Sequence, residues 1–117
     1  MQVFELAQVA KIAGISRFRL KGWILGKTRL TLTPSVRSRK GRYFSAEDAF
    51  KVSVAAALDR AGLAKGAIAE ILPLIPSTLA SRLFVQRGGE RWSVTETPGV
   101  GELRIELNLG DVIARLK

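Results

Sequence analysis

The chain contains no cysteine and no histidine among its 117 residues. These two absences remove the usual ligands of zinc, haem and iron–sulfur sites. They also remove the side chains needed for Cys/His and Ser/His/Asp catalysis, and they exclude a secreted scaffold held by disulfides. We therefore expect a protein that is not an enzyme and that holds no metal and no cofactor.

Long apolar stretches are missing as well. No apolar run reaches the roughly 18 residues that a membrane-spanning helix needs. Residues 1–14 also lack the basic start and the long apolar core of a secretory signal. The sequence therefore predicts a cytoplasmic protein that makes no membrane contact.

Acidic residues are almost absent from the first third of the chain. Residues 1–44 carry ten Lys and Arg against the single Glu5, whereas residues 45–117 carry nine basic and nine acidic residues. The whole formal net charge of +9 therefore belongs to the first 44 residues. Such segregated positive charge is expected of a surface that binds a polyanion, and double-stranded DNA is the predicted partner.

Two short helices are predicted at the start of this basic region. Apolar residues recur at helical spacing from Glu5 to Ala13, and Gly14 suits the left-handed position that ends a helix. Ser16 suits the N-cap of a second helix that runs from Arg17 to about Trp23. Two helices separated by so short a turn are typical of a helix-turn-helix.

The second helix is predicted to have one buried and one basic side. At 100° per residue, Leu20 and Trp23 share a side and should face the core. Basic side chains on the other side fit a DNA major groove. A solvated surface is the alternative, but solvated helices usually mix both signs of charge. The predicted DNA-contacting residues of this helix are Arg17, Phe18, Arg19 and Lys21.

A basic β-hairpin is predicted next. Residues 28–33 alternate between apolar and polar side chains, which indicates a strand that ends at Pro34 and Ser35. A loop is predicted at 36–41, followed by a second short strand at 42–44. Behind a recognition helix such a hairpin is a wing, which places cations along phosphates. Its predicted DNA-contacting residues are Arg37, Arg39, Lys40, Arg42 and Tyr43.

The rest of the chain is predicted to be helical and then β-rich. The residues Ser45 to Asp48 indicate a capping box at the start of a helix that ends near Ala61. A role of Glu47 and Asp48 in this helix start is favoured over a pair of catalytic carboxylates. Another helix follows at 65–72, then a hairpin around Gly88-Gly89, a strand at 102–109 and a helix at 111–116. The predicted buried stripe of the long helix is Phe50, Val54, Ala57, Leu58 and Ala61.

These elements predict an α+β fold in two parts. Residues 1–75 would form a winged helix-turn-helix of four helices plus the hairpin. Residues 76–117 would form a tail with a small antiparallel β-meander and a short C-terminal helix. A tail of this size is too small to be stable alone. It should pack on the helical part, on a second copy, or on another protein.

Four segments together resemble the DNA-binding domain of MerR-type regulators. FELAQVAKIAGIS at 4–16 is similar to the opening of that domain, RYFSAEDAFKV at 42–52 to its passage from wing to third helix, and DRAGLAKGAIAEIL at 59–72 to its fourth helix. Leu20 and Trp23 match the buried positions of its recognition helix. The resemblance covers residues 4–74 and implies a transcription regulator that binds a palindromic site as a homodimer. It also implies that Arg17, Phe18 and Lys21 face the major groove and that Arg42 contacts the backbone.

The chain departs from this family at several points. Phe18 stands where the family usually has Arg, and Gly22 where it often has an aromatic residue. After Leu74 there is no long coiled-coil helix; Pro73, Pro76 and the β-rich tail occupy its place. The same fold also occurs in phage excisionases and small terminase subunits.

The leading hypothesis is a sequence-specific DNA-binding transcriptional regulator associated with the nucleoid, whose tail at 83–117 dimerises or binds a protein partner. One alternative is an architectural DNA binder such as an excisionase or a small terminase subunit. Another is a protein-interaction module that binds an acidic partner.

Overall fold

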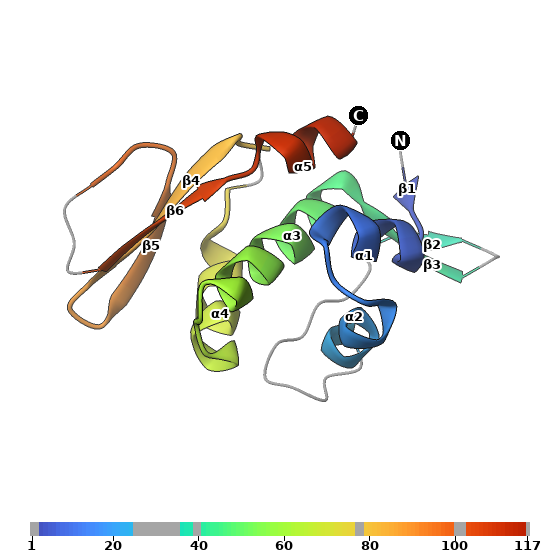
Figure 1. The fold of residues 1–117 in the computed structure, drawn as a ribbon, viewed down its shortest axis with the longest axis horizontal. Helices are drawn as coiled ribbons and strands as arrows, with labels where there is room; N and C mark the ends of the chain where they lie inside the picture. The colour runs from blue at the N-terminus through green and yellow to red at the C-terminus, as the bar shows by residue number, and fades with distance from the viewer. Residues whose placement is uncertain (1–2, 25–35, 39–40, 77–78, 100–102, 117) are drawn as a thin grey trace.

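A computed structural model of the protein describes residues 3–24, 36–38, 41–76, 79–99 and 103–116. The chain forms a mixed α+β fold in which helices lie beside two small antiparallel sheets (Figure 1). The α+β class predicted from the sequence is confirmed.

The fold begins with two short helices, α1 (Leu6–Ala13) and α2 (Arg17–Ile24). Gly14 ends α1 with a φ of 75°, a left-handed conformation that glycine adopts without a Cβ clash. The hydroxyl of Ser16 accepts a hydrogen bond of 3.1 Å from the backbone N–H of Arg19 and so caps α2. Both end signals that the sequence predicted are therefore confirmed.

The first sheet is built around β3 (Gly41–Ser45), which pairs with β1 (Val3–Phe4) on one side and β2 (Val36–Ser38) on the other. The prediction of a loop at 36–41 is wrong for residues 36–38. The pairing of Ser38 with Gly41 closes a hairpin there, and backbone pairing does not require apolar side chains. The strand predicted at 28–33 lies outside the described residues.

Helix α3 (Ala46–Arg60) is the centre of the fold, with α1, α4 and α5 around it (Figure 1). It starts at the predicted capping box: Ser45 Oγ accepts from the N–H of Asp48 at 3.1 Å, and Asp48 Oδ2 accepts from the N–H of Ser45 at 3.0 Å. The predicted single buried stripe of α3 is too narrow, because elements packed on several sides of the helix also bury residues outside that stripe. Ala61 follows the helix and is exposed, so its predicted burial is wrong. The additional buried residues are Ala49, Val52, Ser53, Ala55 and Ala56.

Helix α4 (Lys65–Ile71) runs into a short 3₁₀ turn, η1 (Leu72–Leu74). Ile68 and Ile71 are fully buried, and Leu72 is nearly so. Pro73 lies in the 3₁₀ turn, where its missing N–H ends the helical hydrogen-bond pattern.

The second sheet contains β4 (Arg82–Gly88), β5 (Arg91–Thr95) and β6 (Leu103–Asn108) in the order β5-β4-β6. The predicted meander is therefore wrong, because a meander would have β5 in the middle. β4 is the central strand, and its residues 83–86 are all buried, so both of its faces are covered there. Leu107 pairs with Leu83 and Ile105 with Val85 on the core side.

The strand order requires a crossover, because β5 and β6 are both antiparallel to β4 and thus parallel to each other. The segment that connects β5 to β6 passes beside the buried Gln86. The side chain of Gln86 accepts from the N–H of Gly99 at 2.9 Å and donates to the hydroxyl of Thr95 at 3.0 Å. A Cβ at Gly99 would lie 2.8 Å from Gln86 Oε1, so a larger residue here would displace the Gln86 side chain.

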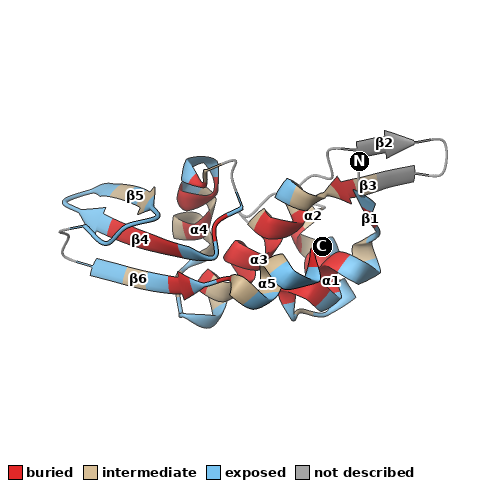
Figure 2. Cartoon of the chain, turned by 90° about the horizontal axis from the view of Figure 1, so that it is seen from above, coloured by how far each residue is buried: buried red, intermediate tan, exposed pale blue. Residues whose placement is uncertain are grey.

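Helix α5 (Gly110–Arg115) brings the chain back to the helical part, where it packs beside α1 and α3. Leu109 and Leu116 are buried in the same core cluster as Val9, Leu58 and Ile71. Figure 2 shows the buried, red end of β6 next to the buried, red part of α3. Of the three places where the tail could pack, the structure shows the helical part.

Candidate nucleic-acid interface

The basic helix α2 is held against the core by two residues. Leu20 is fully buried and Trp23 is 1% exposed, as their shared side of the helix predicted. Both side chains lie one helical turn apart, so the opposite side of α2 is directed away from the core. This orientation decides which of its basic residues a ligand can reach.

The outward side of α2 carries three of the predicted contact residues. Arg17 and Lys21 are exposed, and neither forms an ion pair within the part of the chain that the structure describes. Phe18 is 86% exposed, so it is not part of the core. Its ring is open to water and lies on the same side of α2 as the unpaired Lys21.

Gly22 lies on the same outward side as Phe18. A Cβ built at this position would meet no atom of the described residues within 4 Å, and Gly22 does not have a positive φ. The described fold therefore needs no glycine here. A glycine on the outward side leaves room for another molecule to approach the helix backbone closely.

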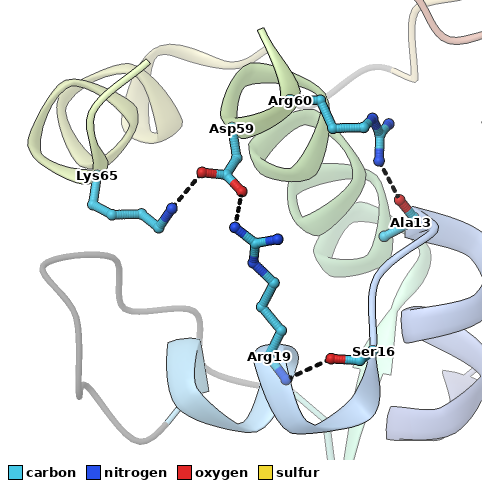
Figure 3. Close-up of polar contacts among 6 residues, drawn as sticks. All are labelled: Ala13, Ser16, Arg19, Asp59, Arg60 and Lys65. Atoms are coloured by element: carbon cyan, nitrogen blue, oxygen red, sulfur yellow. Dashed lines mark hydrogen bonds and ion pairs between the residues drawn. The ribbon is translucent and has the colours of Figure 1, made fainter. Parts of the chain in front are cut away.

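Arg19 differs from its neighbours because its charge is already paired. Its guanidinium forms an ion pair with Asp59 near the end of α3, and it also lies 5.9 Å from the ring centre of Trp23. Lys65 at the start of α4 approaches the other oxygen of the same carboxylate (Figure 3). The Arg19 side chain is still 50% exposed, but the structure gives it a role in fixing α2 to α3.

Two arginines hold the C-terminal end of α1, and sequence reasoning missed both. Arg60 Nη1 donates to the carbonyl of Ala13 at 3.1 Å (Figure 3), and Arg115 Nη1 donates to the carbonyl of Ile12 at 3.1 Å. Helix C-terminal carbonyls lack partners within the helix and attract cations. No local pattern could have shown these contacts, because the partners are 47 and 103 residues apart. Asp59 was missed for the same reason, since Arg19 is 40 residues away.

The hairpin of β2 and β3 carries the remaining predicted contacts. Arg37 and Arg42 stand opposite each other in the strand register, next to the Ser38–Gly41 pair that closes the hairpin. Arg39 and Lys40, the two connecting residues, lie outside the described residues. Tyr43 is half-buried whereas Phe44 is 1% exposed, since successive residues of a strand point to opposite faces. β1 fixes the base of this hairpin by pairing Phe4 with Phe44.

The described residues contain no group of three or more His, Cys, Asp or Glu side chains that could hold a metal ion. Within the same residues, no helix combines the length and the apolar character needed to cross a membrane. Asp48 belongs to the cap of α3, in accordance with the capping interpretation of Glu47 and Asp48.

No protein-family model matches the chain, and no curated protein matches its sequence significantly.

Proposed function

We propose that this protein binds double-stranded DNA sequence-specifically and acts as a transcriptional regulator. In this proposal α2 enters the major groove, and the hairpin of β2 and β3 acts as the wing of a MerR-like winged helix-turn-helix. Helix entry into a groove would supply base readout, and the wing would supply affinity through phosphate contacts.

The observation that carries this proposal is the sorting of charge on α2. The one described acidic side chain that approaches the helix, Asp59, engages the inward Arg19 and leaves Arg17 and Lys21 unpaired on the outward side. Unpaired cations on one side of a helix add little to folding stability, whereas a DNA-binding helix needs them for phosphates and base edges.

The outward aromatic residue fits the same proposal. Phe18 lies one residue after Arg17 in the first turn of α2, where recognition helices contact bases. An apolar side chain at such a position can contact the methyl group of thymine. The open surface at Gly22 would allow the groove walls to come close to the helix.

Selection from a random double-stranded DNA library with the full chain tests the proposal. We expect one enriched sequence motif, with affinity that falls steeply as salt is raised. Arg91→Ala provides a matched control, because Arg91 is an exposed basic residue on β5, outside the proposed interface. Failure to retain any DNA at low salt would refute the proposal, and retention without an enriched motif would refute sequence-specific binding.

A further inference from the structure

Strand β6 is an edge of the second sheet in the part of the chain that the structure describes. It pairs only with β4 among the described residues. Leu103, Arg104 and Glu106 are exposed and Ile105 is half-buried. Figure 2 shows β6 along the border of the sheet with no described element beyond it. An open edge strand presents unpaired backbone groups that can accept another strand.

The backbone groups on the open side can be identified. The N–H of Leu109 donates to the carbonyl of Ser81 at 2.7 Å, which continues the β4–β6 ladder. Backbone groups alternate sides along an antiparallel strand. The N–H and C=O of Ile105 and Leu107 therefore point toward β4, and those of Arg104 and Glu106 point to the open edge.

The charges of β6 are complementary to a second, antiparallel copy of β6. A two-fold axis through one residue places that residue opposite itself in the partner strand. An axis at Arg104 would oppose two guanidiniums, and an axis at Glu106 would oppose two carboxylates; both arrangements are unfavourable. An axis at Ile105 places Arg104 opposite Glu106 of the second copy, and it does so twice.

The same register also suits the backbone and the apolar side chains. Arg104 and Glu106 are the residues whose backbone groups face the open edge, so they would exchange the new hydrogen bonds directly. Ile105 would lie beside Ile105 of the second copy, and Leu103 beside Leu107. Leu103 is 45% exposed in the single chain, so this pairing would cover apolar surface.

The other edge of the sheet lacks these properties. β5 packs against α4, and an axis at its central residue, Ser93, would place Arg91 opposite Thr95. Glu106 already forms an ion pair with Arg82 at 3.2 Å, but its side chain is 52% exposed and has a second oxygen free to accept.

We propose that two copies of this chain dimerise by antiparallel pairing of their β6 strands about a two-fold axis at Ile105, forming one six-stranded sheet. The proposal does not depend on DNA binding, and it holds or fails in the absence of DNA. In this proposal the tail serves as the dimerisation element. Its sheet is nearly neutral, so two copies can meet there while the excess positive charge lies in residues 1–44.

Charge reversal at β6 tests this pairing by sedimentation equilibrium of the full chain without DNA. Arg104→Glu and Glu106→Arg each place like charges opposite each other, and we expect each variant alone to dimerise about tenfold more weakly than the wild type. In an equimolar mixture, the two acidic side chains on β6 of the first variant face the two basic side chains on β6 of the second. We therefore expect the mixture to regain the wild-type affinity as a heterodimer.

The mixture separates loss of pairing from loss of folding, because two misfolded variants would not restore each other. Glu90→Arg, a reversal in the exposed turn between β4 and β5, should leave dimerisation unchanged. A wild-type chain that stays monomeric would overturn the proposal. The proposal would also be overturned if both single variants dimerised as tightly as the wild type, or if their mixture did not regain the wild-type affinity.

Discussion

Arg60 and Ala13 join the end of α3 to the end of α1: Arg60 Nη1 donates to the Ala13 carbonyl at 3.1 Å. The next residues after Ala13 are the turn that leads into α2. Asp59, one residue before Arg60, pairs with Arg19 of α2. Two consecutive residues of the central helix thus fix both the turn and the candidate recognition helix.

Arg60→Ala should lower the free energy of unfolding by about 1–2 kcal/mol, because it removes a charged donor from the carbonyl end of α1. Urea denaturation of the two proteins measures this difference. Arg91→Ala, which removes an exposed arginine from β5, should change stability by less than about 0.5 kcal/mol. Equal stability of Arg60→Ala and wild type would mean that the contact does not hold the turn.

Asp59→Asn should have opposite effects on stability and on DNA binding. It removes the carboxylate shared by Arg19 and Lys65, and we expect a loss of about 1–3 kcal/mol in unfolding free energy. It also leaves Arg19 free to reach a phosphate, which should steepen the salt dependence of DNA affinity by about one counterion. Binding titrations at several salt concentrations measure that slope, and an unchanged slope would place Arg19 away from DNA.

Gly22→Ala should stabilise the protein while it weakens DNA binding. Alanine favours helix over glycine by about 0.8–1 kcal/mol, and the open space at Gly22 causes no clash in the folded chain. If α2 lies in a groove with Gly22 near its wall, the added methyl group should reduce affinity several-fold. Denaturation and DNA titration of the same sample give both values. Unchanged affinity would show that this side of α2 does not face DNA.

Phe18→Ala should leave stability within about 0.5 kcal/mol of wild type, since the ring is 86% exposed. It should weaken binding to the selected site about five- to tenfold and leave non-specific binding unchanged, because an apolar base contact acts only at its own site. Titration with the selected duplex and with a scrambled duplex distinguishes the two. An equal loss on both would contradict a base-specific role for Phe18.

Arg42→Ala and Lys21→Ala should differ in kind. Loss of a phosphate contact at the wing should weaken binding to all sequences alike and flatten the salt slope by about one counterion. Loss of a base contact on α2 should instead change the preferred sequence. Repeating the library selection with each variant shows which occurs. The same outcome for both variants would remove the distinction between helix and wing.

Local signals allowed much of the fold to be predicted. The left-handed Gly14 and the caps at Ser16 and Ser45 depend on hydrogen bonds within a few residues, so they can be read directly from the sequence. The two buried residues of α2 follow from helical spacing alone. The outward position of Phe18 and Lys21 then follows from the same geometry.

Features that depend on distant partners could not be read in this way. The alternation in β6 identifies a strand, but it does not say that β4 rather than β5 is its neighbour. The ion pair between Arg19 and Asp59 could not be predicted for the same reason. A sequence shows the charge of Arg19, but it does not show that a distant residue of the chain pairs with it. The burial of α3 on several sides likewise depends on helices that arrive later in the chain.

The contact between Arg115 and the Ile12 carbonyl has a consequence for how the protein is made. A ribosome produces α1 and α2 long before α5, so the nascent N-terminal segment must wait for α5 before its carbonyl end is fully paired. Contacts between residues so far apart in the sequence slow folding, because closing the long intervening loop costs conformational entropy before the contact forms. We therefore expect α1 and α2 to complete their folding only after residue 116 has left the ribosome.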